Sequence, residues 1–250
     1  SFRKIEPNVS IYKFFSKPVL YVKGDAGSGK SHFLADIVNT RMKHHLKSLF
    51  ALGLQFNQIE DVRERLMDIW CVKGSWDDFL DKLNKIGEIE KHRILIIIDG
   101  INEGLGNHLW PNVLAGIEAD ILQYPNLGLI ISARTFSNTN MLDEISKDKA
   151  TITMEGFQGM EDEAIKYMTG KFGVTFPQIS NFRKEFANPL FLKLYCQAYS
   201  SSTATMPKSF LDVIKHYLGK VNEKLASKYN YQAALYNYTQ QVANVLTELY

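Results

Sequence analysis

The order of apolar and polar residues predicts that strands and helices alternate along the first 155 residues. Short apolar runs predict strands at 18–23, 48–55, 94–98, 128–133 and 151–154. The run at 94–98 (ILIII) is the clearest, and continuous β-branched character is typical of a strand covered by helices on both faces. Between the runs, apolar residues recur at helical spacing over 33–42, 59–69, 76–86 and 113–121. This alternation predicts an α/β fold with a parallel sheet.

The second part of the chain has a different pattern. After Phe157 the strand signal stops, and apolar residues recur at helical spacing over 165–172, 210–221 and 231–249. We therefore predict a domain boundary near residue 155, with an α/β domain at 1–155 and a smaller all-α domain at 156–250. The last helical pattern continues to the final residue without a cap, which leads us to expect a fragment of a larger protein.

Composition and charge exclude several classes of protein. Hydrophobic residues make up 45% and charged residues 22% of the chain, as in ordinary globular proteins. The net charge of +2 is too small to indicate nucleic acid as a partner. The basic cluster at 41–47 leaves a local contact open, although a solvated helix end is the simpler interpretation.

No apolar stretch reaches the roughly 18 residues that span a bilayer, and no signal peptide is recognisable, so we expect a cytoplasmic protein without a membrane partner. The two cysteines, Cys71 and Cys196, have no partner at metal-binding spacing. They are therefore predicted to be packing residues.

A glycine-rich loop carries the first chemical signal. Residues 24–31 (GDAGSGKS) match GxxxxGK[ST] between a predicted strand and a predicted helix. Glycines let backbone N–H groups approach phosphate oxygens, and the helix N-terminus adds partial positive charge. Lys30 is predicted to contact the β- and γ-phosphates and the Ser31 hydroxyl to ligate magnesium. The predicted nucleotide contacts in this loop are Gly24, Asp25, Ala26, Gly27, Ser28, Gly29, Lys30, Ser31 and His32.

Two acids follow the clearest strand. Asp99 ends the run at 94–98, where a carboxylate at the carboxyl edge of the sheet is predicted to hold magnesium together with Ser31. The alternative is an aspartate that only begins a turn with Gly100. Glu103 lies four residues later, where a carboxylate can orient or deprotonate the attacking water. Its alternative is an exposed loop acid.

The spacing of the motifs indicates the subclass. Between Lys30 and Asp99 there is room for a whole strand and two helices, which favours the ATPase (ASCE) branch of P-loop proteins. In that branch a further strand separates the two motif strands in the sheet. The strand at 128–133 leads to Arg134, a fixed cation predicted to contact the γ-phosphate. A surface arginine that caps a loop is the alternative. The predicted catalytic residues are Lys30, Asp99, Glu103 and Arg134.

Four motifs together resemble the STAND family of signal-transduction ATPases, especially its NACHT-like and antiviral bacterial members. They are GDAGSGKS at 24–31, IIIDGINE at 96–103, IISART at 130–135 and NPL at 188–190. The resemblance covers roughly residues 15–220. It implies a switch that binds ATP or ADP with magnesium, forms a homo-oligomer in the ATP state and controls an attached effector. It also implies that the effector and sensor domains lie outside this chain, which ends at or before a winged-helix region.

The resemblance further implies a role for Pro189, which occupies the proline of the family's GxP motif and would pack on the adenine. Asn188 stands where the family has glycine. Local chemistry offers another explanation, because an asparagine cap followed by proline is a common helix start. Both interpretations remain open at this point.

Three functions are compatible with these motifs. The leading hypothesis is a slowly hydrolysing regulatory ATPase in innate or antiviral defence. The first alternative is a mechanical ATPase of the AAA+ type, which acts on nucleic acid or protein as a ring and needs an arginine finger in trans. The second is a scaffold that binds ATP and barely hydrolyses it. Turnover separates them, because a ring motor is fast and steeply dependent on protein concentration.

Overall fold

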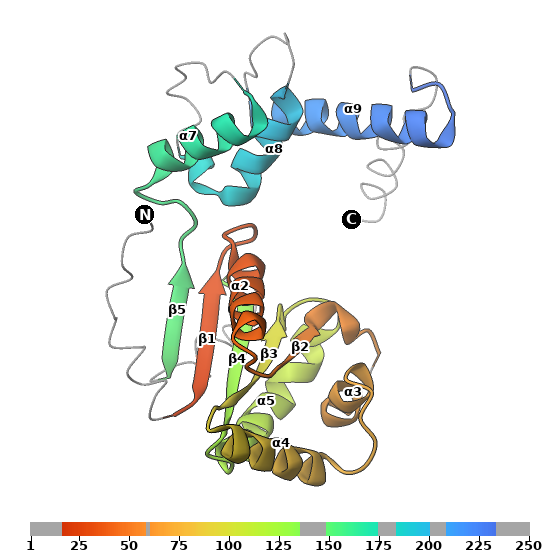
Figure 1. Cartoon of the computed structure of the whole chain (residues 1–250). Coiled ribbons are helices and arrows are strands. Elements are labelled where there is room, and N and C mark those ends of the chain that lie inside the picture. The colour runs from red at the N-terminus through yellow and green to blue at the C-terminus, as the bar shows by residue number, and fades with distance from the viewer. Residues whose placement is uncertain (1–16, 59–60, 136–148, 175–183, 201–208, 234–250) are drawn as a thin grey trace. The chain divides into compact units, whose positions relative to one another are not determined.

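The apolar runs form the strands of one parallel sheet, shown in Figure 1. The structure is a computed structural model that describes residues 17–58, 61–135, 149–174, 184–200 and 209–233. In the described residues, the strands are β1 (Val19–Gly24), β2 (Ser48–Leu52), β3 (Ile94–Asp99), β4 (Leu127–Arg134) and β5 (Ala150–Met154). Their order is β2-β3-β4-β1-β5, with parallel pairing between neighbours. The carboxyl ends of all these strands therefore meet at one edge.

The strand order confirms the predicted P-loop ATPase topology. β4 lies between β1, which leads into the glycine-rich loop, and β3, which ends at Asp99. β2 comes between them in sequence but lies at the edge of the sheet. β2 is also shorter than the predicted strand at 48–55, because Gly53–Gln55 forms a 3-10 turn, η1.

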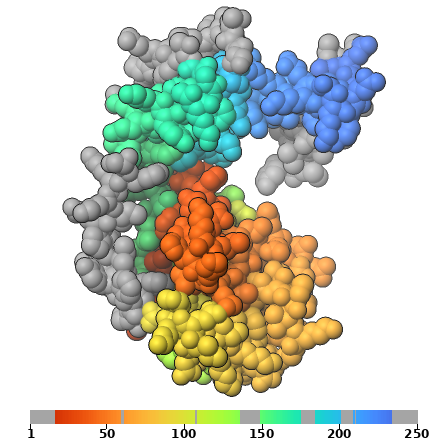
Figure 2. All heavy atoms as spheres, viewed as in Figure 1, coloured from red at the N-terminus to blue at the C-terminus, as the bar shows by residue number. Residues whose placement is uncertain are grey.

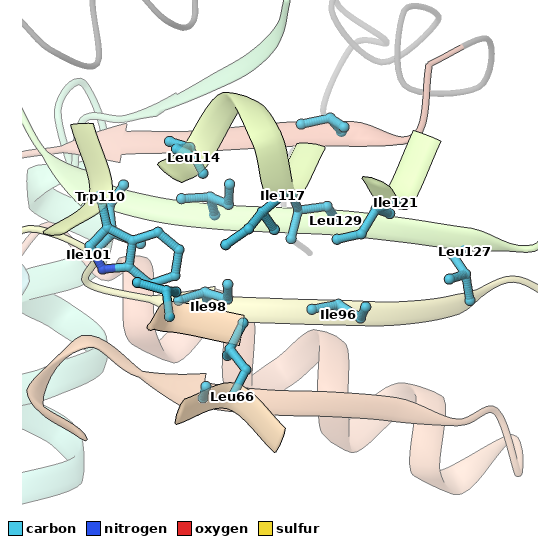
Figure 3. Packing of buried hydrophobic residues seen from close by; sticks show 14 of the residues in the cluster. Leu66, Ile96, Ile98, Ile101, Trp110, Leu114, Ile117, Ile121, Leu127 and Leu129 are labelled. Carbon is cyan, nitrogen blue, oxygen red and sulfur yellow. The ribbon is translucent and has the colours of Figure 1, made fainter. Parts of the chain in front are cut away.

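Helices cover both faces of the sheet, which explains why the central strands β3 and β4 lack polar alternation. α2 (Lys30–Lys43) packs on one face, and its red-orange atoms lie at the surface in Figure 2. The other face packs against α3 (Val62–Ile69), α4 (Trp76–Glu90) and α5 (Gly106–Leu122). Figure 3 shows Leu114, Ile117 and Ile121 of α5 over β3 and β4. Alternate strand residues thus enter two separate apolar layers.

Side-chain caps fix where two of these helices begin. The Asp61 carboxylate accepts hydrogen bonds from the backbone N–H groups of Arg63 and Glu64 at the start of α3. The Ser75 hydroxyl accepts from the N–H of Asp78 at the start of α4. Such caps satisfy N–H groups that have no partner within the helix. The helical pattern was predicted from residue 59, but residues 59–60 lie outside the described part of the chain.

The segment after β2 packs directly against the loop after β3. A Cβ atom on Gly53 would lie 1.8 Å from the carbonyl oxygen of Gly100, so no side chain fits between the two backbones. Nearby, the N–H of Leu105 donates to the carbonyl of Phe56 at 3.1 Å. The loop that carries Glu103 is therefore held by the edge of the sheet as well as by its own strand.

The basic cluster at the end of α2 contains one residue with a structural role. The Arg41 guanidinium donates to the Ser48 hydroxyl and to the carbonyls of Lys47 and Arg93. These contacts tie the end of α2 to the starts of β2 and β3. Lys43, His44 and His45 are exposed, as expected for a solvated helix end.

An ion pair lies under α5 on the face opposite α2. The Glu118 carboxylate on α5 is paired with Lys149, which directly precedes β5. The Glu118 side chain is 7% exposed and that of Lys149 is 33% exposed. Burial raises the pKa of Glu118, whereas the hydrogen bond and the charge of Lys149 lower it. The Lys149 ammonium also lies 5.5 Å from the centroid of the Tyr21 ring. The lysine is thus the main compensation for a buried negative charge.

Replacing Lys149 with methionine is expected to destabilise the protein by about 2 kcal/mol at neutral pH, because the buried Glu118 carboxylate loses its cation. This is less than for a fully buried pair, since Lys149 is partly exposed. Without the lysine the pKa of Glu118 rises further above its unfolded value. Protonation of Glu118 then favours the folded variant as pH falls through that pKa. The loss of unfolding free energy relative to wild type therefore becomes smaller towards about pH 4. Urea unfolding over this pH range measures it.

Lys85→Met is the matched control, because the ion pair of Lys85 with Asp81 is exposed on α4. It is expected to leave the unfolding midpoint nearly unchanged. Equal losses in the two variants would contradict a special contribution from the pair of Glu118 and Lys149.

The second compact unit, Glu155–Tyr250, is helical in its described part. It contains α7 (Glu161–Phe172), the 3-10 turn η3 (Glu185–Ala187), α8 (Pro189–Tyr199) and α9 (Phe210–Tyr229). Phe186, Leu192 and Tyr195 are among its buried residues. Of the pattern predicted at 231–249, residues 234–249 lie outside the described part. Among the described helices, none has the length and apolarity needed to cross a bilayer.

The two cysteines differ in their surroundings. Cys196 is buried in α8, as predicted for a packing residue, and burial raises the pKa of its thiol to about 11. Cys71 is exposed, so its prediction as a packing residue is wrong. It lies two residues after the end of α3 with a φ of 55°, between Trp70 and Val72, which pack against the core.

Candidate functional site

The glycine-rich loop connects β1 to α2 through backbone positions that require glycine. A Cβ atom on Gly24 would lie 2.5 Å from the Met154 carbonyl oxygen, so a side chain there would collide with the end of β5. Gly29 has a φ of 104° and is the N-cap residue of α2. Both positions keep the loop compact and its backbone accessible, which is how a loop presents N–H groups to an anion.

The N-terminus of α2 forms the next part of the candidate site. No side chain caps this helix, and its first turn contains no acidic residue. Ser31 and His32 are exposed in that turn. The Ser28 hydroxyl is buried in the loop and has no hydrogen-bond partner among the described residues. The helix N-terminus and an unsatisfied hydroxyl thus offer several donors that fit a phosphate group.

Lys30 is the buried cation of the loop. Its ammonium group donates to the carbonyl oxygens of Gly24 at 2.6 Å and Asp25 at 2.8 Å, and the residue is 8% exposed. Burial lowers the pKa of Lys30 and so does the charge of Arg134, whereas Asp99 is the first of the carboxylates that raise it. A desolvated cation whose hydrogen bonds go to neutral carbonyls is well suited to bind an added anion.

The end of β3 is tied to β4 through one serine. The Ser132 hydroxyl donates to Oδ1 of Asp99 and accepts the backbone N–H of Gly100 at 2.8 Å. The N–H of Ile101 donates to the Ser132 carbonyl at 3.0 Å. Asp99 is 7% exposed, so the carboxylate sits in a defined and largely desolvated position. Together with the Ser31 hydroxyl, it provides oxygen ligands of the kind that magnesium prefers.

Glu103 and Arg134 form an ion pair at the same edge of the sheet. The Arg134 guanidinium donates to Oε1 of Glu103 at 3.0 Å, and the side chains are 48% and 31% exposed, respectively. The backbone N–H of Arg134 donates to Oδ1 of Asn102 at 2.9 Å. Arg134 on β4 is paired in register with Gly24 on the neighbouring strand β1, and Gly24 is the first residue of the loop. The Arg134 side chain therefore leaves the sheet beside the glycine-rich loop, and its partner is a partly exposed carboxylate with which an anion can compete.

The structure places the predicted catalytic residues on neighbouring strand ends. Lys30 lies in the segment after β1. Asp99 is the last residue of β3, and Glu103 lies in the loop that follows it. Arg134 is the last residue of β4. Pro189 belongs to the helical unit, where it is the first residue of α8, and the Asn188 side chain accepts from the N–H groups of Leu190 and Phe191. Local capping therefore accounts for these two residues, and the contact of Pro189 with adenine stays a prediction.

Two polar residues at this edge were not among the predicted site residues. Ser132 orients Asp99, and Asn102 holds the backbone of Arg134. The sequence contained a signal for Ser132, since its hydroxyl interrupts the apolar run at 129–133. A buried polar side chain in such a position needs a hydrogen-bond partner, which points to a role beyond packing.

Comparisons with known proteins place this geometry in a family. The family model "NACHT domain" matches residues 18–169. Domain III of the Thermotoga maritima replication initiation protein DnaA is similar in structure, with 15% identity, a TM-score of 0.46 and coverage of 82% of this chain and 88% of that chain. CDC6P from Pyrobaculum aerophilum is 15% identical, with a TM-score of 0.47 and coverage of 85% and 56%. C. elegans PCH-2 is 14% identical, with a TM-score of 0.44 and coverage of 84% and 62%.

These structural likenesses are weak, since each TM-score is below 0.5. The chain spans only 62% of the PCH-2 chain and 56% of the CDC6P chain. A search of curated proteins finds no match. The family model, in contrast, extends from the start of β1 through the phosphate loop and all five described strands into α7. Because this match covers more than half of the 250 residues, the chain belongs to the NACHT domain family of P-loop NTPases.

Proposed function

We propose that this chain is the nucleotide-operated switch module of a STAND-class signalling ATPase. In this proposal it binds ATP with magnesium, hydrolyses ATP slowly, and controls self-association and an attached effector in a defence response. Membership of the NACHT family supports nucleotide binding, and members of the family generally hydrolyse nucleotides. The effector, the sensor and the homo-oligomeric ATP state belong to the longer protein and rest on the resemblance of the four motifs.

One observation carries the proposal: among the described residues, the buried Lys30 ammonium donates its hydrogen bonds to two neutral carbonyls, beside the charged ends of β3 and β4. Lys30 is proposed to bind the β- and γ-phosphates, and the N–H groups of the loop to cradle them. Ser31 and Asp99 would hold magnesium, which neutralises phosphate charge when bound. Glu103 is proposed to accept the proton of the attacking water. Pro189 is proposed to pack on the adenine.

Turnover as a function of protein concentration tests the proposal against the mechanical alternative. A switch module is expected to hydrolyse ATP slowly, at a rate per molecule that does not change with its concentration. A ring motor completes its active site with a neighbouring subunit, so its rate per molecule rises steeply as the protein assembles. Fast, concentration-dependent hydrolysis would overturn the switch proposal, and an absence of ATP binding in calorimetry would overturn nucleotide function altogether.

The ion pair of Glu103 and Arg134 suggests how the two nucleotides are distinguished. A γ-phosphate can compete with the Glu103 carboxylate for the Arg134 guanidinium, whereas ADP has no γ-phosphate to offer. The two nucleotides then differ in interaction energy with the site. A ligand shifts a conformational equilibrium only through such a difference. Arg134 is therefore the proposed source of the difference between the ATP and ADP states.

Replacing Arg134 with alanine is expected to narrow the affinity gap between ATP and ADP by about 1 to 3 kcal/mol, the usual contribution of a hydrogen bond to a charged group. ADP affinity itself should hardly change. Calorimetry with each nucleotide and magnesium measures both values. Arg134→Lys serves as the matched variant, because it keeps the charge but loses the planar fork, and should retain part of the gap. An equal loss for both nucleotides would make Arg134 a structural residue.

A further inference from the structure

Ser132 is a buried hydroxyl on the strand that separates the two motif strands. It has no solvent exposure, lies next to Val22 of β1 in register, and contacts Asp99 at the end of β3. Most of its neighbours along β4 are apolar. A buried hydroxyl in such a strand costs free energy unless it is hydrogen-bonded. The hydrogen bonds of the Ser132 hydroxyl therefore compensate for its burial.

The two hydrogen bonds of the Ser132 hydroxyl fix the direction of its proton. A serine hydroxyl has one proton to donate and two lone pairs to accept with. The Gly100 N–H takes up a lone pair of Oγ at 2.8 Å, and the proton is directed to Oδ1 of Asp99. Oδ1 of Asp99 is thus held by a donor, and rotation of the carboxylate is restricted. Because Oδ1 is held by Ser132, the direction of the second carboxylate oxygen, Oδ2, is also set.

The backbone of Ser132 strengthens the same arrangement. Its carbonyl accepts the N–H of Ile101 at 3.0 Å, so both residues that follow Asp99 are bound to one position of β4. Gly100 has a φ of 73°, which turns the chain sharply at this point. Ser132 therefore sets the position of the backbone after Asp99 and the orientation of its carboxylate at the same time.

The nature of the donor also matters. An arginine or lysine in this position would orient the carboxylate but would offset its negative charge, which attracts a divalent cation. A neutral hydroxyl orients the carboxylate and adds no positive charge. Groups that orient a metal ligand from behind commonly change metal affinity by about 10- to 100-fold when they are removed.

We propose that Ser132 is a positioning residue that aims the Asp99 carboxylate at the divalent cation of the bound nucleotide. The inference rests on the proposed function, because it assumes that nucleotide binds with a metal ion. It predicts a specific division of effects: Ser132 should govern how much metal the site needs and should have little influence on the metal-free contacts of the nucleotide with the phosphate loop.

The experiment measures ATP affinity of the whole chain by calorimetry over a series of magnesium concentrations and also in the presence of a chelator. The magnesium concentration that gives half of the metal-dependent gain in ATP affinity is expected to be about tenfold higher in Ser132→Ala than in wild type. Affinity in chelator should stay within about twofold of wild type, because Lys30 and the loop are unchanged. Ser132→Thr keeps the hydroxyl and should need the same magnesium concentration as wild type.

Two controls separate positioning from a general disturbance of β4. Ile131→Val removes one methylene from the neighbouring buried position, which has no hydrogen bond to Asp99, and should leave the magnesium requirement unchanged. In an Asp99→Asn background, Ser132→Ala should produce no further change, because there is no longer a carboxylate to aim. Melting temperature without metal identifies any variant that fails to fold.

Three results would overturn the inference. The first is an unchanged magnesium requirement in a folded Ser132→Ala variant. The second is an equal loss of ATP affinity with and without metal. The third is a Ser132→Ala effect on the magnesium requirement that is as large in the Asp99→Asn background as in wild type. The wild-type titration tests the proposed function separately. A wild-type chain that binds ATP equally well with and without magnesium would contradict the proposed metal site itself, whatever the variants show.

Discussion

Alanine in place of Lys30 is expected to abolish measurable ATP binding while the protein remains folded. The ammonium group is the buried cation of the loop, and its hydrogen bonds go to the carbonyls of Gly24 and Asp25. Contacts with two phosphates would be lost together, each a hydrogen bond between charged groups. The expected loss is at least about a hundredfold in affinity, or about 2.7 kcal/mol. Calorimetry with ATP and magnesium measures it.

The fold should tolerate this change, since burial lowers the pKa of Lys30 and so makes its charge costly in the empty loop. A melting curve of the variant checks that expectation. Lys43→Ala is the matched control, because Lys43 is an exposed lysine in the last turn of the same helix. It makes the same change in net charge and should leave ATP affinity unaltered. Unchanged affinity in Lys30→Ala would mean that the loop does not bind phosphate.

Glutamine in place of Glu103 is expected to slow ATP hydrolysis by about 10²- to 10⁴-fold, because it keeps the shape of the side chain and removes the base. ATP binding should be retained. The variant also removes the negative partner of Arg134, so the guanidinium becomes freer to contact the γ-phosphate. Single-turnover hydrolysis, measured with ATP bound to saturation, separates the chemical step from binding.

Glu88→Gln is the control for this experiment, since Glu88 is exposed on α4 and is not part of the site. Asp99→Asn gives a useful contrast, because it weakens the magnesium site and should raise the metal concentration that hydrolysis requires. Turnover at the wild-type rate in Glu103→Gln would remove Glu103 from the catalytic residues and leave Asp99 as the remaining acid.

Local patterns in the sequence predicted most elements of the first unit, because the central strands β1, β3 and β4 are buried on both faces. The run at 94–98 became β3, which extends one residue further to Asp99. Helix starts were less predictable. The pattern that predicted a helix from residue 113 belongs to α5, which begins at Gly106. The first turns of α5 include His108, which is exposed, and Pro111, neither of which carries an apolar helical signal.

The candidate site was predicted in part, and the remainder depends on contacts between strands. Lys30, Asp99, Glu103 and Arg134 were recognised from motifs that are continuous in sequence. The role of Ser132 depends on β4 lying beside β3, where its hydroxyl reaches Asp99. Periodicity within a strand contains no information about which strand is its neighbour. The ion pair between Glu103 and Arg134 was missed for the same reason.

The close contact between Gly53 and Gly100 links the loop that carries Glu103 to the edge strand β2. Because the two backbones touch without a side chain between them, a shift of the loop that carries Glu103 must push the segment after β2. That segment presents Leu52 and Leu54, which are 42% and 62% exposed. A surface that packs on these two leucines would therefore be displaced whenever the loop that carries Glu103 moves.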